Sequence, residues 1–224
     1  MLITLGVIGV VAAITIPGLI QNHQANKLRS QFLKAYSEVS QALKMMKYDE
    51  ISLDPTSYSR ENKFINVFSS YFKVAHLCGD NSAINEARNK TLCYYNGDTS
   101  YKTLDGKRTP DWGRFDDGQF VLLDGALVMI ENPFTLANQQ PIWITIDING
   151  KNAKPNRLGY DVFTFVVADT EEIVPMGSKG TRYTDMNTGC NPNVSIYYNG
   201  FACAYKALNQ TDYFKQVVKT VKIK

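Results

Sequence analysis

The first 22 residues of the chain contain no Asp, Glu, Lys or Arg, and an amphipathic pattern follows them without a break. In a helix that rises ~1.5 Å per residue, such a run matches the roughly 30 Å hydrocarbon thickness of a bilayer. The sequence therefore predicts an apolar, membrane-length segment over residues 1–22 that continues directly into a soluble helix.

Steps of three and four residues between apolar positions mark the continuation as a helix with one buried face. Proline disfavours a helical conformation at the residue before it, so we expect the helix to end before Pro55. We predict one helix over residues 1–48, bent or loosened at Pro17. The apolar positions are Leu28, Phe32, Ala35, Val39, Ala42, Leu43 and Met46.

The length of the remaining chain is typical of one domain. Residues 23–224 provide the amphipathic half of the helix and one globular domain large enough to bury its own core. The formal net charge of +3 and the pI of about 8.5 are mild. Nucleic-acid-binding proteins usually carry a clustered basic face, so we do not expect a nucleic acid partner.

The four cysteines fall into two local pairs, Cys78 with Cys93 and Cys190 with Cys203. Four cysteines allow three connectivities, and the sequence alone leaves these open. The local pairing is the simplest, and each short loop that it closes is worth about 3 kcal/mol in the chain-entropy model. An even number of cysteines favours disulfides in an oxidising compartment. We therefore expect the domain to face outward.

Turn signals divide the second half of the chain into strands. Asp124-Gly125 accepts the positive φ values of a type I′ hairpin turn, and Asn149-Gly150 ends an alternating segment. A shorter helix is predicted over residues 60–77. The order of elements predicts an α+β fold, in which the long N-terminal helix packs on an antiparallel sheet. The predicted strands are residues 120–123, 126–130, 142–148 and 161–167.

Two segments of the chain carry motifs. The first is the apolar run LITLGVIGVVAAITIP from Leu2 to Pro17. The second comprises Asp147-Ile148-Asn149-Gly150, Pro155-Asn156, Gly159 and Asp161-Val162-Phe163. The first resembles the N-terminal class III signal segment of the type IV pilin and type II secretion pseudopilin superfamily, and the second is similar to a sheet motif of pseudopilin-like proteins. The remainder of the chain matches the family only in architecture.

The resemblance implies a pilin-like fold and a structural role in a type IV pilus or type II secretion pseudopilus. The implied partners are identical or related subunits, an inner-membrane assembly platform and the lipid bilayer, and also a prepilin peptidase if the full-length chain has a leader. The implied location is the bacterial inner membrane, with a single span and the domain in the periplasm or outside, and then an extracellular filament. The implied membrane and assembly helix includes Leu2, Ile3, Gly6, Gly9, Ala13 and Pro17.

The first cations, Lys27 and Arg29, follow the apolar segment. The positive-inside rule would place them in the cytoplasm, which conflicts with the outward-facing domain that the cysteines indicate. A basic leader upstream of Met1 would resolve the conflict. The resemblance implies such a leader, together with a cleavage glycine, a phenylalanine and a glutamate that would also lie upstream of Met1. We therefore expect the chain to be truncated at its start.

Oxygen-bearing side chains gather around the turn predicted at residues 149–150. Calcium takes 6–8 oxygen ligands, and some pseudopilins of the family that the chain resembles bind calcium in loops beside the sheet. Turn capping by the same side chains is the alternative, and two lysines within the loop do not fit an EF-hand. Calcium is the one cofactor that we hypothesise. Its candidate ligands are Asp147, Asn149, Asn152 and Asp161.

The sequence contains no serine-hydrolase, zinc-protease or phosphate-loop motif, and its two histidines have no matched acid–base partners. We therefore expect no enzymatic activity. The alternative to a filament subunit is a membrane-anchored periplasmic binding or adhesion module that does not polymerise. Exposed aromatic side chains would contact the ligand of such a module, namely Tyr94, Tyr95, Tyr101 and Trp112.

Overall fold

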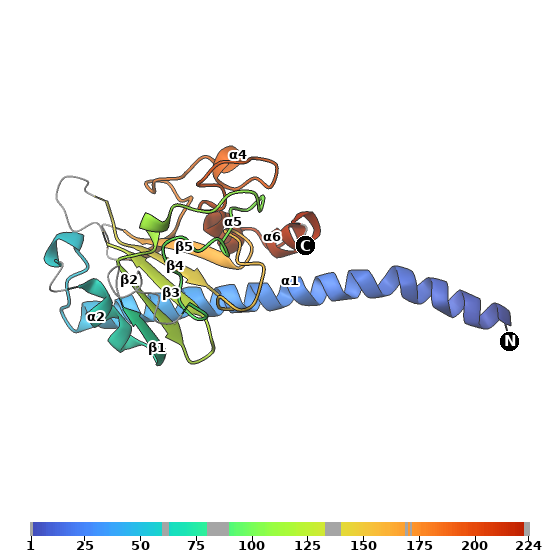
Figure 1. Ribbon diagram of the computed structural model, residues 1–224, viewed down its shortest axis with the longest axis horizontal. Helices are drawn as coiled ribbons and strands as arrows, with labels where there is room; N and C mark the ends of the chain where they lie inside the picture. Colours follow the sequence, from blue (N-terminus) through green and yellow to red (C-terminus); the bar gives the residue numbers. More distant parts are fainter. Residues whose placement is uncertain are drawn as a thin grey trace.

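A long N-terminal helix lies across one face of a six-stranded antiparallel sheet in the computed structural model of the chain (Figure 1). The fold is therefore α+β, as the sequence predicts. The structure describes residues 2–59, 63–79, 90–132, 140–168, 170 and 172–221. Within these ranges, side chains are described from residue 13 onward.

Helix α1, Leu2–Tyr48, is a single element of 47 residues, which confirms the helix predicted over residues 1–48. Pro17 lies inside it, and the helix curves gently in its N-terminal half (Figure 1). A Schellman motif ends the helix, because the N–H of Ile51 donates to the carbonyl of Met46 at 2.9 Å. Glu50 adopts the left-handed conformation that this ending requires, with a φ of 58°.

The six strands follow one another across the sheet in the order of the sequence, and each strand pairs antiparallel with the next. This order allows turns and loops to join the strands without crossover helices. The strands are β1 (Val74–Gly79), β2 (Gly118–Leu122), β3 (Leu127–Glu131), β4 (Trp143–Asp147), β5 (Val162–Val167) and β6 (Ile173–Pro175). The strands predicted in the second half of the chain thus correspond to β2, β3, β4 and β5.

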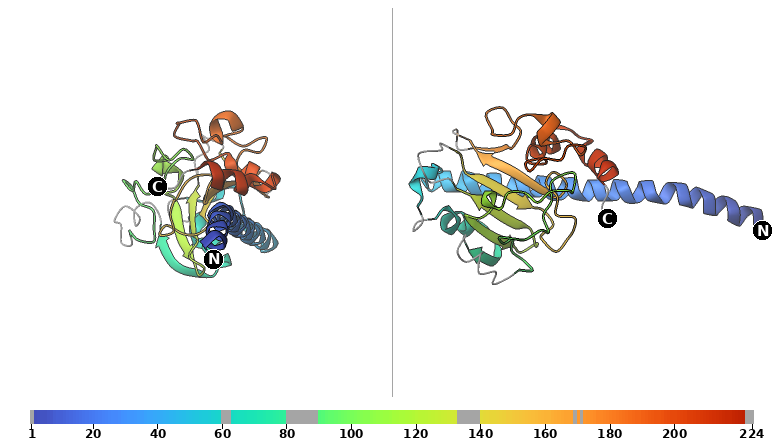
Figure 2. Two further views of the ribbon diagram at one scale, coloured as in Figure 1. Left: turned by 90° about the vertical axis from the view of Figure 1, so that its right-hand side faces the viewer. Right: turned by 45° about the horizontal axis from the view of Figure 1, so that its top comes forward.

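Both faces of the central strands are buried, because side chains alternate between two hydrophobic clusters. On one face, Phe32 of α1 meets Phe163 of β5 with ring centroids 4.7 Å apart. Loop residues such as Phe201 cover the other face, against Trp143. Figure 2 shows α1 on one side of the sheet and the loops on the other. The buried residues of α1 are Ala25, Leu28, Phe32, Ala35, Val39, Ala42, Leu43 and Met46.

Shorter helices surround this core. Helix α6 packs alongside α1, and α5 contacts β5 and β6. The α-helices that follow α1 are α2 (Phe64–Phe68), α4 (Met186–Gly189), α5 (Cys203–Asn209) and α6 (Tyr213–Thr220), and short 3-10 helices lie at Pro55–Ser57, Ser69–Tyr71 and Trp112–Arg114.

The helix predicted over residues 60–77 is wrong in its second half. Helix α2 and the following 3-10 helix end at Tyr71, and Val74–Gly79 forms strand β1 at the edge of the sheet. Pairing with β2, a distant strand, outweighs the helical spacing of the apolar residues. Residues 60–62 of this prediction lie outside the described residues.

The β2–β3 hairpin is confirmed, but its turn differs from the predicted type. Gly125 has a φ of 92°, whereas Asp124 is not in the left-handed region. A type I′ turn requires a positive φ at both central residues. The connection instead spans residues 123–126, with the N–H of Leu122 donating to the carbonyl of Ala126 at 2.8 Å.

Within the side chains that the structure describes, no helix has a stretch long and apolar enough to cross a membrane. This finding contradicts the single-pass location in the inner membrane that the resemblance implies. The side chains of Leu2, Ile3, Gly6 and Gly9 lie outside the described part.

Candidate functional site

The N-terminal part of α1 projects beyond the domain (Figure 1). Every residue from 13 to 23 is exposed. The domain contacts the helix at Gln24, whose Nε2 donates a 2.7 Å hydrogen bond to the hydroxyl of Tyr160. Large apolar side chains in water are unfavourable until a partner covers them. Those in this projecting part are Ile14, Ile16, Leu19 and Ile20, which are 73%, 52%, 71% and 59% exposed.

The exposed apolar side chains do not form a single stripe. Successive helical residues turn by about 100°, so Ile14 points away from the side that carries Ile16 and Leu19. A helix that is apolar on all sides is normally surrounded by other apolar surfaces. Ala13 and Pro17, two predicted assembly residues, lie in the same exposed part. The projecting helix is therefore suited to burial among several neighbouring helices.

Two aspartates are fully buried at the ends of the β4–β5 loop, Asp147 and Asp161. All four of their carboxylate oxygens accept hydrogen bonds from within the protein, with closest distances of 2.6–3.0 Å. The donors in these closest contacts are the N–H groups of Gly150, Asn156 and Arg157 and the hydroxyl of Tyr101. The two carboxyl groups thus fasten the loop to itself and to the core.

Burial raises the pKa of both carboxyl groups, because water no longer stabilises the charged forms. The charge of Asp147 raises the pKa of Asp161 further, whereas the hydrogen bonds that both groups accept oppose the rise. Two interacting acids in a dry site titrate as a pair. Protonation of this pair removes charge from the dry site and therefore favours the folded protein.

The structure brings together three of the four candidate calcium ligands. Nδ2 of Asn149 lies 3.5 Å from Oδ2 of Asp161, and the N–H of Asn149 donates to Oδ1 of Asp147 at 3.3 Å. Asn152 is exposed and lies outside this set of hydrogen bonds. Because N–H and O–H donors already contact the carboxylate oxygens, the geometry favours the turn-capping alternative. Calcium binding by this loop stays a hypothesis.

Lys151 lies in the same loop, but its side chain turns inward to a contact that the sequence does not predict. Its Nζ lies 2.5 Å from Oδ2 of Asp98 and donates to the carbonyls of Lys90 and Cys93, each at 2.6 Å. Burial lowers the pKa of Lys151, and the hydrogen bond to Asp98 opposes this. Lysine in a polar turn is usually solvated, so the sequence offered no signal for this contact.

Asp116, Asp117 and Glu131 form an acidic cluster, with one carboxylate oxygen of each within 4.8 Å of the others. Burial, and then the charges of the two aspartates, raise the pKa of Glu131 to about 8. The guanidinium of Arg114 lies 3.7 Å from the carboxylate of Glu131 and opposes this rise. Glu131, at the end of β3, therefore exchanges its proton at a much higher pH than an ordinary glutamate.

The aromatic residues predicted to contact a ligand are largely packing residues. Tyr94 and Tyr101 are each 1% exposed, and their ring centroids lie 4.7 Å apart. Trp112 packs edge-on against Tyr94 with a centroid distance of 5.0 Å. These contacts belong to the hydrophobic cluster that covers the outer face of the sheet.

Both predicted local disulfides are present. Cys78 is joined to Cys93 and Cys190 to Cys203. The first disulfide links edge strand β1 to the loop before Tyr94, and the second links the end of α4 to the start of α5. Of the three connectivities that the sequence left open, the structure has the local one.

Comparison with models of protein families, with curated proteins and with solved structures finds no match to this chain. The resemblance to the pilin and pseudopilin superfamily therefore stays a prediction that rests on the motifs of the sequence.

Proposed function

We propose that the chain is a structural subunit that assembles into a filament of the type IV pilus or type II secretion pseudopilus kind. One observation carries this proposal: a long helix leaves the domain and exposes apolar side chains on more than one side, including Ile14 and Leu19. The role is structural rather than enzymatic. The partners are identical or related subunits, and the fold is pilin-like.

The energetics support assembly through this helix. Burying one Ile or Leu side chain completely is worth about 1.5–3 kcal/mol. Four such residues therefore provide a driving force comparable to the free energy that is lost when two molecules associate. Each further neighbour that covers another side of the helix adds to this gain. A contact with several subunits is thus more favourable than a contact with one.

The arrangement of the helix and the domain also supports a filament. The projecting part and the domain lie at opposite ends of the same helix (Figure 1). If the projecting helix of one subunit packs beside that of the next through a different surface, such head-to-tail contacts generate open helical assemblies. The domains remain outside a central bundle of helices.

Assembly is tested by sedimentation and negative-stain electron microscopy of the full chain over a range of concentrations. We expect the wild type to form elongated assemblies and the double variant Ile14→Asn/Leu19→Asn to remain monomeric. The matched control is Tyr48→Asn, because Tyr48 is 88% exposed at the opposite end of α1. We expect this control to assemble like the wild type.

The thermal unfolding of the double variant should match that of the wild-type monomer, because Ile14 and Leu19 are exposed and lie before the first contact with the domain at Gln24. The proposal is overturned by a wild type that stays monomeric at every concentration. It is equally overturned by a folded double variant that assembles as readily as the wild type.

A further inference from the structure

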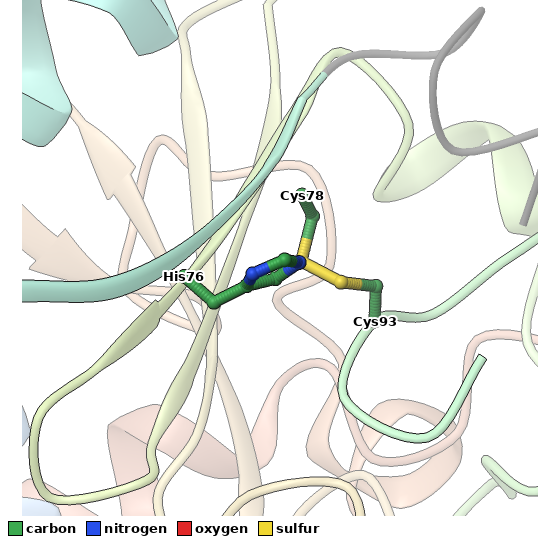
Figure 3. Close-up of side chains that lie close together, drawn as sticks. All are labelled: His76, Cys78 and Cys93. Atoms are coloured by element: carbon green, nitrogen blue, oxygen red, sulfur yellow. A yellow bond between two sulfur atoms is a disulfide. The ribbon is translucent and has the colours of Figure 1, made fainter. Parts of the chain in front are cut away.

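The disulfide between Cys78 and Cys93 has a histidine beside it. One ring nitrogen of His76 and both sulfur atoms lie within 4.8 Å of one another. Figure 3 shows the imidazole ring of His76 next to the disulfide, with Cys78 on the same strand and Cys93 on the neighbouring loop. The three side chains are therefore already gathered around one point.

Strand geometry explains the placement of two of these groups. His76 and Cys78 are two residues apart on β1, so they lie on the same face of the strand. Strand β1 is at the edge of the sheet, with β2 as its neighbour, and both residues are partly exposed. Among the residues that the structure describes, no strand pairs with the outer edge of β1. A reductant or a metal ion can thus approach the partly exposed side of the site, whereas Cys93, which is 6% exposed, forms its inner side.

The position of Cys93 does not depend on the disulfide alone. Its carbonyl accepts a 2.6 Å hydrogen bond from Nζ of Lys151. The N–H of the next residue, Tyr94, donates to Oε1 of Gln119 on β2 at 3.0 Å, and Nε2 of Gln119 donates to the carbonyl of Phe115 at 2.9 Å. These contacts keep Cys93 beside His76 after the S–S bond opens.

The second disulfide has a different environment. Cys190 and Cys203 are 4% and 0% exposed. The hydroxyl of Tyr213 lies 3.9 Å from Sγ of Cys190, and Nζ of Lys206 donates to the carbonyl of Cys190 at 3.2 Å. Among the described residues, the group of potential metal ligands that includes a histidine lies at the first disulfide. The two disulfides therefore provide an internal comparison.

We propose that His76, Cys78 and Cys93 form a thiol-gated site for Zn²⁺, closed as the disulfide and opened by a dithiol reductant. In the first step, the S–S bond accepts two electrons and two protons, and the dithiol becomes a disulfide. In the second step, Zn²⁺ replaces the protons of both thiols and binds the imidazole, with release of two protons. The site is neutral, because two thiolates balance the charge of the ion.

The chemistry of the three groups fits zinc. Zinc binds thiolate sulfur at about 2.3 Å and imidazole nitrogen at about 2.0 Å in a tetrahedral arrangement. The two sulfurs around such an ion are roughly 3.8 Å apart, and rotation about the Cα–Cβ bonds allows this separation because the Cα atoms of Cys78 and Cys93 are 6.0 Å apart. Three protein ligands leave a fourth position for water.

The test compares zinc content in the oxidised and the reduced full chain. The protein is reduced with a dithiol without air, freed of the dithiol, incubated with zinc alone and desalted, and zinc is measured by elemental mass spectrometry. Peptide mapping identifies which disulfide was reduced. We expect about one zinc ion per reduced chain, as the three-ligand site requires, and no zinc on the oxidised chain.

Variants assign the bound ion to this site. We expect Cys78→Ser/Cys93→Ser to bind no zinc and His76→Ala to bind it more weakly than the wild type, because the site then lacks its imidazole ligand. The matched control, Cys190→Ala/Cys203→Ala, should still bind zinc after reduction. In cobalt-loaded protein, absorption from thiolate-to-metal charge transfer should vanish in the first variant, and the ligand-field bands should shift in His76→Ala.

Each other result contradicts the proposal. A folded, reduced wild type that binds no zinc overturns it, as does zinc binding that persists in Cys78→Ser/Cys93→Ser. Global unfolding on selective reduction of the first disulfide, followed by circular dichroism, also overturns it, because the contacts of Lys151 and Gln119 are then insufficient to hold Cys93. His76→Ala with unchanged affinity removes the histidine from the site.

Discussion

The hydroxyl of Tyr101 donates a 2.6 Å hydrogen bond to Oδ2 of Asp147, and both side chains are fully buried. Tyr101 lies in the long connection between β1 and β2, whereas Asp147 ends β4. The bond therefore connects the covering loops to the centre of the sheet. It also opposes the effect of burial, which raises the pKa of Asp147.

Substitution of Tyr101→Phe should destabilise the domain by about 1–3 kcal/mol, because a buried carboxyl group loses its donor. The pKa of Asp147 should rise further. Urea unfolding measures the loss of stability. The control is Tyr205→Phe, which removes the hydroxyl of a tyrosine that is 40% exposed. A loss no larger than that of the control would contradict the importance of the Tyr101–Asp147 bond.

The acidic cluster at Glu131 predicts an unusual pH dependence. The pKa of Glu131 in the folded protein is about 8, chiefly because of burial, whereas an unfolded glutamate titrates near 4.3. Between these values the folded state binds more protons than the unfolded state. The stabilisation that protonated Glu131 contributes is therefore complete below the pKa of the unfolded state. It is lost as the pH rises through the pKa of the folded state.

We expect Glu131→Gln to flatten this dependence and to raise the free energy of unfolding at pH values of about 8 and above. Urea denaturation across the pH range from acidic to mildly alkaline conditions measures the effect. Glu38→Gln is the control, because the side chain of Glu38 is 38% exposed on α1. If wild type and Glu131→Gln show parallel pH profiles, Glu131 does not carry the dependence.

The sequence predicts the elements whose signals are local. The helix over residues 1–48 follows from a continuous helical spacing, and β4 and β5 follow from alternation and turn residues. The sequence does not predict strand β1, because the apolar residues of β1 continue the helical spacing of α2. Pairing with β2 is what makes this segment a strand. Long-range pairing of this kind has no local signal.

The candidate site in the β4–β5 loop shows the same difference between local and long-range signals. The turn predicts Asp147 and Asp161 correctly as members of the site, but the sequence favours Asn152, whereas Asn156 is the buried residue. Asn156 has a φ of 54°, and this left-handed turn directs its backbone N–H to Asp161. Burial of Tyr94 and Tyr101 likewise depends on loops that cover the sheet. Spacing along the chain does not contain this information.

Calcium addition discriminates between the two interpretations of the β4–β5 loop. A cation that bound the folded protein alone would raise the melting temperature. We expect neither calcium nor a chelator to change it, because N–H and O–H donors already contact the oxygens of Asp147 and Asp161. Differential scanning calorimetry measures the effect. A calcium-dependent rise that disappears in Asp161→Asn would establish the metal site instead.

Shortening a buried side chain of α1 should destabilise the domain far more than shortening an exposed side chain of the same helix. Phe32 is fully buried and packs against Phe163, with centroids 4.7 Å apart, and against Phe214, with centroids 5.6 Å apart. We expect Phe32→Ala to destabilise the domain by about 3–5 kcal/mol. Leu33→Ala changes the next residue, which is 39% exposed, and should change stability by about 0.5 kcal/mol or less. Equal effects in urea unfolding would mean that α1 does not dock as described.

Lys151 and Asp98 form a buried ion pair, and removing both charges should cost less stability than removing one. Their side chains are 8% and 5% exposed. Lys151→Met leaves the carboxylate of Asp98 buried without its partner, and a broken buried pair typically costs about 3–5 kcal/mol.

The double variant Lys151→Met/Asp98→Leu removes both charges and should recover much of this loss. Recovery should be incomplete, because the carbonyls of Lys90 and Cys93 still lose the donor that Lys151 provided. Urea unfolding with both disulfides intact measures the three proteins. If the double variant is no more stable than Lys151→Met, the loss arises from these two carbonyls rather than from the unpaired charge.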